Sequence, residues 1–245
     1  MRHKIFRIIG ILLLLAGIAV WAAPYVAQQI YQSHADQVAA NFNAEGARLA
    51  ELYAADSEAS PYLRELYAAM QAYNKEIYEN KQVNLKDPFS YEQASFDLRQ
   101  WGFAENLVGY INIPRMRVTL PIYLGATVEN MRKGAVHLSQ TSLPIGGENT
   151  NTVLAAHRGS WAGAMFRDIE KLQIGDEITV TNLWATLTYR VAELKVISPN
   201  DIHEVYIQGG RELVTLITCH PYRHNYQRYV VYCERVTASG APAVI

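Results

Sequence analysis

The chain has 245 residues, of which 50% are hydrophobic and 18% are charged, and its formal net charge is -1. This length and apolar content are sufficient to bury a full hydrophobic core, and 16 tyrosines with only 9 prolines do not fit a disordered chain. The nearly balanced charge argues against nucleic acid as a partner, because nucleic-acid binding calls for a clustered basic face.

The chain begins with an apolar segment. Residues 8–23 form an unbroken apolar run that follows Arg2, Lys4 and Arg7. Extended to Ala27, the run reaches about 20 residues, which spans a bilayer core, and the basic residues before it favour a cytoplasmic N-terminus. A cleaved signal peptide is the alternative, although its apolar core is usually about 7–15 residues long. We expect residues 1–27 to be a single N-terminal anchor in the cell membrane, with the rest of the chain outside the cytoplasm.

Residues 28–105 are predicted to form a helical extension. Helical patterning covers residues 33–82, with a weaker helix at about 36–54 and a second helix that starts at Ser60-Pro61. In the second helix the apolar residues recur every three or four positions and form one packing face: Leu63, Leu66, Tyr67, Met70, Tyr73 and Ile77. A loop is expected at about 81–95, because a residue before proline, such as Asp87 before Pro88, avoids the helical region.

Residues 106–238 are rich in short β-strand patterns separated by turn signals. The predicted strands cover residues 109–113, 118–123, 152–156, 177–181, 186–198, 213–219 and 228–236. Short strands with little helix between them favour a closed, mostly antiparallel β-barrel. A short helix is expected at 163–172, and residues 239–245 are expected to be a tail that is too short to cross a membrane.

Three residues with the chemistry for acyl transfer lie at strand ends. Cys219 ends the strand TLITC, His157 follows the strand TVLAA, and Arg228 begins the last strand, nine residues after the cysteine. A thiolate can act as a nucleophile, an imidazole can move its proton, and a guanidinium can stabilise an oxyanion. A cysteine whose pKa is near its ordinary value of about 8.5 needs a cationic neighbour to react well. We therefore expect folding to bring the three together.

Each of these residues also has an ordinary structural explanation. A single cysteine in an apolar strand is often buried packing, and an arginine is often part of a surface ion pair. His220 and His224 lie close to Cys219 in the sequence and compete as the base, and Arg223 is a second candidate cation. Because His220 is adjacent to the cysteine, it points to the opposite side of the strand, which favours His157.

The remaining patterns indicate structure rather than a cofactor. The sequence contains no HExxH or CxxC metal motif and no glycine-rich phosphate loop, so we expect no metal and no cofactor. Cys233 is predicted to be a small buried core residue rather than a disulfide partner. Strand alternation places Cys233 and Arg228 on opposite faces, so Cys233 faces away if Arg228 faces Cys219.

These motifs resemble those of the sortase family, and specifically the class C sortases that assemble pili. TLITC resembles the TLxTC motif of the family, LAAHRG resembles its histidine segment, and the arginine nine residues after the cysteine resembles its third catalytic residue. The resemblance runs from about 109 to 236. It implies a mostly β fold, an eight-stranded sortase-type β-barrel with short helices and an N-terminal helical extension. It also implies Cys219 as nucleophile, His157 as general acid and base, and Arg228 as the oxyanion-binding residue.

The resemblance to class C depends on Asp87-Pro88-Phe89, which is similar to the Asp-Pro-aromatic lid that precedes the barrel in that class. It implies that Asp87 pairs with Arg228 and that Phe89 covers Cys219. The carboxylate then masks the cation, and the ring excludes water until substrate displaces both. An ordinary loop with no lid role is the alternative. Many class C members also have a C-terminal membrane segment, which does not occur in this sequence.

The reaction that the resemblance implies is transpeptidation. A cysteine transpeptidase of this class cleaves a Leu-Pro-x-Thr-Gly-like sorting signal between Thr and Gly, forms a thioacyl-enzyme, and joins pilin subunits through a lysine isopeptide bond. The implied partners are the membrane and pilin or surface-protein substrates with a C-terminal sorting signal. Three alternatives remain: a housekeeping sortase that attaches surface proteins to a cell-wall precursor, a secreted cysteine protease, and a non-catalytic, membrane-tethered binding module.

Overall fold

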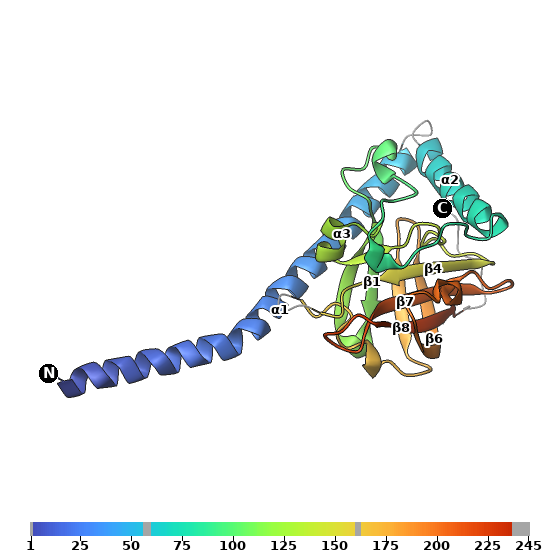
Figure 1. The fold of residues 1–245 in the computed structure, drawn as a ribbon. Helices are drawn as coiled ribbons and strands as arrows, with labels where there is room; N and C mark the ends of the chain where they lie inside the picture. Colours follow the sequence, from blue (N-terminus) through green and yellow to red (C-terminus); the bar gives the residue numbers. More distant parts are fainter. Residues whose placement is uncertain (1, 56–59, 160–162, 237–245) are drawn as a thin grey trace.

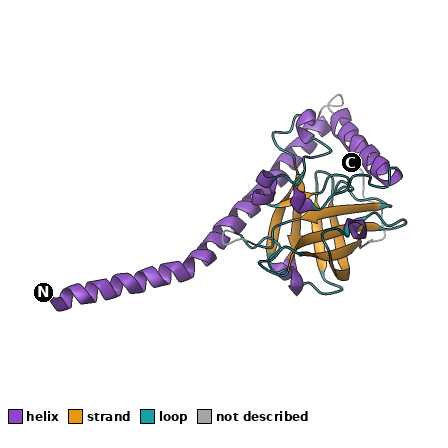
Figure 2. Cartoon of the chain, viewed as in Figure 1, coloured by secondary structure: helices purple, strands orange, loops and turns teal. Residues whose placement is uncertain are grey.

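The computed structural model describes residues 2–55, 60–159 and 163–236, and the tail expected at 239–245 lies outside these ranges. The helices are α1 (Arg2–Ala55), α2 (Ser60–Glu79) and α3 (Val128–Lys133), with 3-10 turns η1 (Pro88–Ser90), η2 (Leu98–Trp101), η3 (Pro114–Met116), η4 (Ile169–Lys171) and η5 (Ile202–Val205). The strands are β1 (Leu107–Ile113), β2 (Val118–Leu124), β3 (Ala135–His137), β4 (Thr150–Ala155), β5 (Glu177–Thr181), β6 (Thr186–Ile197), β7 (Glu212–His220) and β8 (Gln227–Arg235). Figure 2 shows strands gathered into one barrel and a long helix that extends away from it.

The eight strands close into a barrel in the order β1-β2-β3-β4-β7-β8-β6-β5. The pairs β2–β3 and β4–β7 are parallel, and the other neighbouring pairs are antiparallel. The predicted closed, mostly antiparallel barrel is confirmed. The seven strands predicted from local pattern all occur, but β3 was missed because three residues are too few to show a two-residue period.

The prediction of a helix at 163–172 is wrong. The segment forms turns that end in η4. Met165 has a φ of 40°, which an α-helix cannot contain. Ala164, Met165 and Phe166 are all buried in succession, whereas a surface helix buries only one side.

α1 is one continuous helix rather than a separate anchor and a second helix at 36–54. Its first half is apolar and exposed, whereas Ala35, Ala39 and Phe42 in its second half are buried against the barrel. Figure 1 shows a bend between the two parts, and Pro24, which removes a backbone donor, lies between them. Within the described residues, α1 is the helix long and apolar enough to cross a membrane.

Two apolar clusters hold the barrel and its cover together. The main core fills the barrel interior, and Leu66 and Met70 of α2 contribute to it, as the predicted packing face requires. The second cluster includes Ile217 of β7 and Val230 of β8, whose side chains alternate with interior residues and therefore lie on the outer face of the barrel. Phe89 packs against this second cluster. The loop at 81–95 thus lies on the outer face of β7 and β8.

Candidate active site

Cys219 and Arg228 lie opposite each other on neighbouring strands. β7 and β8 are antiparallel, and the Cα register pairs Cys219 with Arg228. Residues that are directly opposite in such a pair have Cα atoms about 4.5–5.5 Å apart and side chains on the same face. The backbone therefore brings the thiol and the guanidinium to one side of the sheet.

His157 reaches the same region from β4. β4 runs parallel to β7 with Ala155 paired to Ile217, and Ala156 N then donates to Ile217 O at 3.3 Å. Two residues beyond this pair lie His157, in the loop after β4, and Cys219, in β7. Since parallel strands keep a constant register, the backbone of His157 leaves β4 next to the end of β7 that carries Cys219. Figure 1 shows β4 and β7 as neighbours.

The guanidinium of Arg228 is held by Asp87. Nε donates to one carboxylate oxygen at 2.6 Å and Nη2 donates to the other at 2.8 Å. Nη1 donates to the carbonyl oxygens of Asn225 and Gln227 at 2.8 and 2.9 Å. Arg228 is only 5% exposed. An oxyanion can therefore reach the Nε–Nη2 edge only after the Asp87 carboxylate moves away.

Phe89 covers the same site. Its ring centroid lies 4.8 Å from Arg228 Cζ and 6.0 Å from the centroid of the His157 imidazole. Asp87 accepts a hydrogen bond from Phe89 N at 3.2 Å, and Pro88 between them is buried. This short turn thus places a carboxylate and an aromatic ring on two of the three residues expected to act together.

Burial decides the protonation of the thiol and the imidazole. Desolvation raises the pKa of Cys219; the positive charge of Arg228 opposes this shift and the negative charge of Asp87 adds to it. Desolvation, followed by the charge of Arg132, lowers the pKa of His157. With the loop in place, both groups are therefore neutral at neutral pH.

A second group of contacts lies behind the cysteine, and the sequence analysis missed it. Arg158 is 5% exposed, and its Nη1 donates to Cys219 O at 3.2 Å and to His220 Nδ1 at 2.7 Å. Its Nη2 lies 2.5 Å from a carboxylate oxygen of Glu170. The available signal was the arginine directly after His157, because alternation sends neighbouring side chains to opposite sides.

The competing residues lie away from the thiol. His220 contacts Arg158 on the far side of β7, and His224 and Arg223 are exposed in the turn that follows. Cys233 is fully buried in the barrel interior, where desolvation raises its pKa. Both cysteines are free. The opposite faces expected for the two cysteines are therefore observed.

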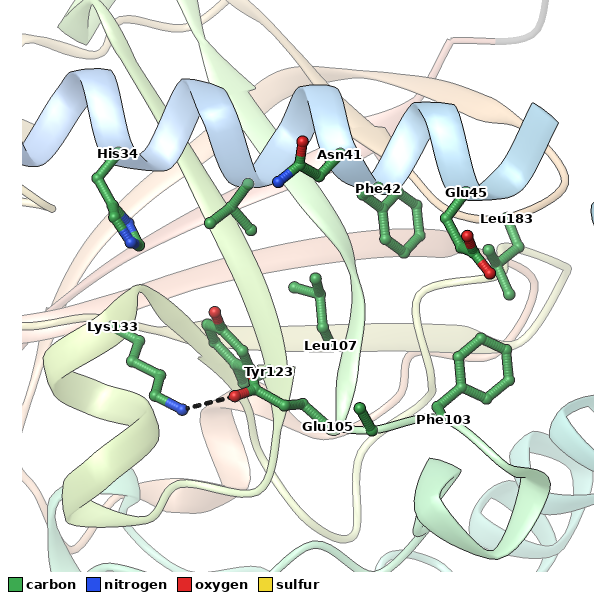
Figure 3. Close-up of a pocket in the computed structure, with 12 residues that line it drawn as sticks. His34, Asn41, Phe42, Glu45, Phe103, Glu105, Leu107, Tyr123, Lys133 and Leu183 are labelled. Carbon is green, nitrogen blue, oxygen red and sulfur yellow. Dashed lines mark hydrogen bonds and ion pairs between the residues drawn. The ribbon is translucent and has the colours of Figure 1, made fainter. Parts of the chain in front are cut away.

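A separate pocket of about 640 Å³ lies between α1 and the barrel. Figure 3 shows the aromatic side chains of Phe42, Phe103 and Tyr123 in its lining, and the Lys133–Glu105 ion pair, 3.1 Å long, at its edge. The residues that line this pocket include neither the three expected catalytic side chains nor the loop at 81–95. It stands apart from the thiol chemistry.

Comparison with known proteins identifies the family. Residues 111–236 match the sortase domain. The chain is 31% identical over 170 residues to sortase A of Bacillus anthracis, covering 66% of this chain and 76% of that protein. It is 29% identical over 132 residues to sortase D of Bacillus subtilis, covering 53% of this chain and 64% of that protein. The solved sortase C of Streptococcus pneumoniae superposes with a TM-score of 0.72 at 30% identity, covering 84% of this chain and 99% of that one. The chain therefore belongs to the sortase family of cysteine transpeptidases, and its structural neighbours include class C sortases.

Proposed function

We propose that this protein is a pilus-assembling sortase in which Cys219 is the nucleophile, His157 the general acid and base, and Arg228 the oxyanion-binding residue. The observation that carries the proposal is the pairing of Cys219 with Arg228 across β7 and β8, beneath Asp87 and Phe89. The similarity to the Streptococcus pneumoniae sortase C, whose structure was solved with a view to pilin substrate specificity, supports pilins as the substrate class.

The first half of the reaction forms a thioacyl-enzyme. Neutral His157 accepts the thiol proton, and the Cys219 thiolate attacks the threonine carbonyl of a Leu-Pro-x-Thr-Gly-like signal. Arg228 stabilises the resulting oxyanion. The C–N bond to glycine then breaks, and His157 passes its proton to the departing amine.

The second half joins two proteins. A lysine amine of another pilin subunit attacks the thioester carbonyl, and His157 accepts the proton that the amine loses. The C–S bond breaks, the Cys219 thiolate leaves, and an isopeptide bond remains. With the lid closed, the Phe89 ring beside the imidazole limits access of water to the resting site.

Asp87, Pro88 and Phe89 act as a lid in this scheme. Substrate displaces the Asp87 carboxylate from Arg228, which frees the edge that binds the oxyanion. The negative charge of Asp87 helps to raise the pKa of Cys219. Movement of Asp87 away from the site therefore lowers that pKa and increases the thiolate fraction. Opening therefore admits substrate and activates the nucleophile together.

The proposal assigns residues 1–27 to a single membrane anchor, 28–105 to the helical extension with the lid at about 81–95, and 106–238 to the catalytic barrel, followed by a tail at 239–245. The exposed apolar half of α1 and the basic residues before it support this division. The barrel then lies outside the cytoplasm, attached to the cell membrane at one end.

A trapped intermediate tests the reaction. The full chain is incubated with a sorting-signal peptide, and the intact mass of the protein is measured before and after a lysine-bearing pilin is added. We expect a thioacyl adduct on Cys219 that the pilin lysine resolves into an isopeptide. Cys219→Ala should form no adduct, whereas Cys233→Ala, in the buried second cysteine, should still form one.

The products separate the alternatives. Free acid as the main product indicates a protease, and transfer only to a peptidoglycan-like amine indicates a housekeeping enzyme. Joining of pilins by the Cys219→Ala variant would contradict the assignment of the nucleophile.

A further inference from the structure

A groove of about 960 Å³ lies between α1 and the barrel, at the end of the exposed half of the helix. The helix lines it with Pro24, Tyr25, Gln28 and Gln29, and the barrel lines it with residues from 115–117 and 167–173. Figure 1 shows the exposed half of α1 projecting from the barrel beyond this contact.

The helix fixes the level of this groove relative to a bilayer. The apolar run ends at Ala27, and about 20 helical residues rise about 30 Å, the thickness of the hydrocarbon core. Gln28 is the first polar residue after the run, so it lies at the outer headgroup level. Arg167 Nη2 donates to Gln28 Oε1 at 2.6 Å, which holds a barrel loop at that same level.

The barrel is attached firmly to this part of the helix. Tyr31 OH donates to Lys133 O at 3.1 Å, and Gln32 Nε2 donates to Thr119 O at 3.3 Å. At Gly163 the backbone packs directly on the Tyr31 ring, since an added Cβ would lie 2.9 Å from it. The loops around the groove therefore cannot swing away from the membrane without breaking these contacts.

Basic side chains predominate around the groove. Arg115, Arg117, Arg167 and Lys171 line it, together with the acidic Asp168 and Glu170. Lys171 lies 3.1 Å from Asp168, but its side chain remains 63% exposed. Glu170 is engaged by Arg158 on its other side. Four cations against two carboxylates leave an excess of two positive charges in the lining, although Arg115 also lies near Asp176 just outside it.

An exposed apolar residue lies in the same region. Ile174 is 72% exposed, the largest exposed fraction of any large apolar side chain outside α1 in the described ranges. Arg115 holds both ends of the turn that carries it: Nε donates to Lys171 O at 3.2 Å and lies 3.5 Å from an Asp176 carboxylate oxygen. An apolar tip flanked by cations is typical of surfaces that enter a membrane interface.

We propose that Arg115, Arg117, Lys171 and Ile174 form a docking surface for anionic phospholipid headgroups of the leaflet from which α1 emerges. The cations bind lipid phosphates, and Ile174 enters the interface. This inference relies on the proposed anchor role of residues 1–27 but not on the transpeptidase chemistry. Docking holds the barrel in one orientation above the bilayer, with the Arg158–Glu170 pair connecting the docked face to the backbone of Cys219.

Hydrogen exchange of the full chain in lipid nanodiscs tests the proposal. Peptides that cover 114–117 and 167–176 are compared between phosphatidylcholine discs and discs with about 30% phosphatidylglycerol. We expect exchange in both segments to slow several-fold in the anionic discs only. The difference should disappear at about 1 M salt, where the screening length falls to about 3 Å.

Charge variants identify the residues. Each cation near an anionic surface contributes about fivefold to association, so Arg115→Gln, Arg117→Gln and Lys171→Gln together should remove roughly two orders of magnitude of docking and with it the difference between lipids. The matched control changes Lys75, Arg99 and Arg211 to Gln, which removes the same number of charges from partly ion-paired side chains elsewhere. Ile174→Ser should weaken docking, and Val128→Ser, another exposed apolar residue, should not.

The docking surface would be overturned by equal exchange in the two lipids, or by a difference between lipids that survives in the variant with Arg115, Arg117 and Lys171 changed to Gln. Protection by inorganic phosphate in uncharged discs would likewise show that a free anion, rather than a lipid, is the ligand. A failed anchor is distinguishable, because the chain would then not co-float with vesicles of either composition.

Discussion

Consecutive residues on β7, and consecutive residues in the loop after β4, point into two different chemical environments. Cys219 faces Arg228 and the lid, whereas His220, the next residue, contacts Arg158 on the other side. His157 and Arg158 divide in the same way. Because neighbouring residues of an extended chain point in opposite directions, the proposed catalytic side chains lie on one side while Arg158 holds the backbone of Cys219 from the other.

Asp87→Asn should make Cys219 more reactive. The negative charge of Asp87 adds to the raised pKa of the thiol, so its removal lowers that pKa and increases the thiolate fraction. A fall of the thiol pKa by one would raise the iodoacetamide labelling rate at neutral pH about tenfold. The rate is measured against pH by mass spectrometry. Glu92→Gln, in the same loop, is the control, and an unchanged midpoint in Asp87→Asn would contradict the lid assignment.

His137 should make the protein less stable in acid. It is 2% exposed, and desolvation lowers its pKa to about 4 although its Nε2 donates to two carbonyl oxygens. Between pH 6.5 and 4 the unfolded state binds more protons, so the free energy of unfolding falls by about 3 kcal/mol as the pH decreases through this window. Denaturant unfolding at several pH values measures the loss.

A histidine resonance assigned to His137 that titrates near its ordinary pKa of about 6.5 would contradict this expectation. His137→Gln should flatten the same part of the pH profile, since glutamine keeps a donor but does not titrate.

Among the structural elements, the loop at 81–95 is attached to the barrel by hydrogen bonds near both of its ends. The Gln82 side chain donates to Gln140 O and accepts from Ile207 N. Further along, Glu92 N donates to Ala126 O, and Gln93 O accepts from a serine hydroxyl on the barrel. Residues 83–91, which contain the Asp87–Arg228 pair, lie between these fixed points. The proposed lid is therefore confined to 83–91 and is shorter than the predicted loop.

Asp87→Ala should release this inner segment alone. Without its two hydrogen bonds to Arg228, we expect faster hydrogen exchange at 83–91 and unchanged exchange at 92–95. Sorting-signal peptide bound to the wild-type chain should give the same pattern. Faster exchange across the whole loop would instead indicate general loss of packing.

At the scale of the whole molecule, α1 combines an exposed apolar half and a half that packs on the barrel in one continuous helix. Its first half is exposed and apolar, and its second half is a packing partner of the barrel through Phe42 and its neighbours. A helix transmits position without the slack of a flexible linker. The site is thus held at a set height above the proposed membrane.

Two deletions should separate the contributions of these two halves. Removal of residues 2–27 deletes largely exposed side chains, so the melting temperature should change little while membrane association is lost. Removal of residues 2–44 also deletes Ala35, Ala39 and Phe42, whose burial contributes about 2–4 kcal/mol, and should lower the melting temperature by roughly 5–10 °C. Calorimetry compares the two, and equal melting temperatures would contradict the packing role of α1.

The elements with a strong local pattern were predictable from sequence. The α2 packing face and strands such as β5, which matched its predicted range of 177–181, follow from side-chain period and turn residues. The three-residue β3 and the turns at 163–172 were not predictable, because they depend on what packs around them. The union of the anchor and the following helix into α1 was missed because the apolar run ends at Ala27 and helical patterning was recognised only from residue 33.

The sequence by itself determined which reactive side chains the protein has and where a helix long and apolar enough to cross a membrane begins, since both follow from residue chemistry and local period. Only the tertiary structure decided that Asp87 meets Arg228 across 141 positions, that Phe89 packs near His157, and that Arg158 binds the backbone of Cys219. It also decided that the thiol and the imidazole are neutral, because protonation depends on desolvation and on charges that come close only when the barrel closes.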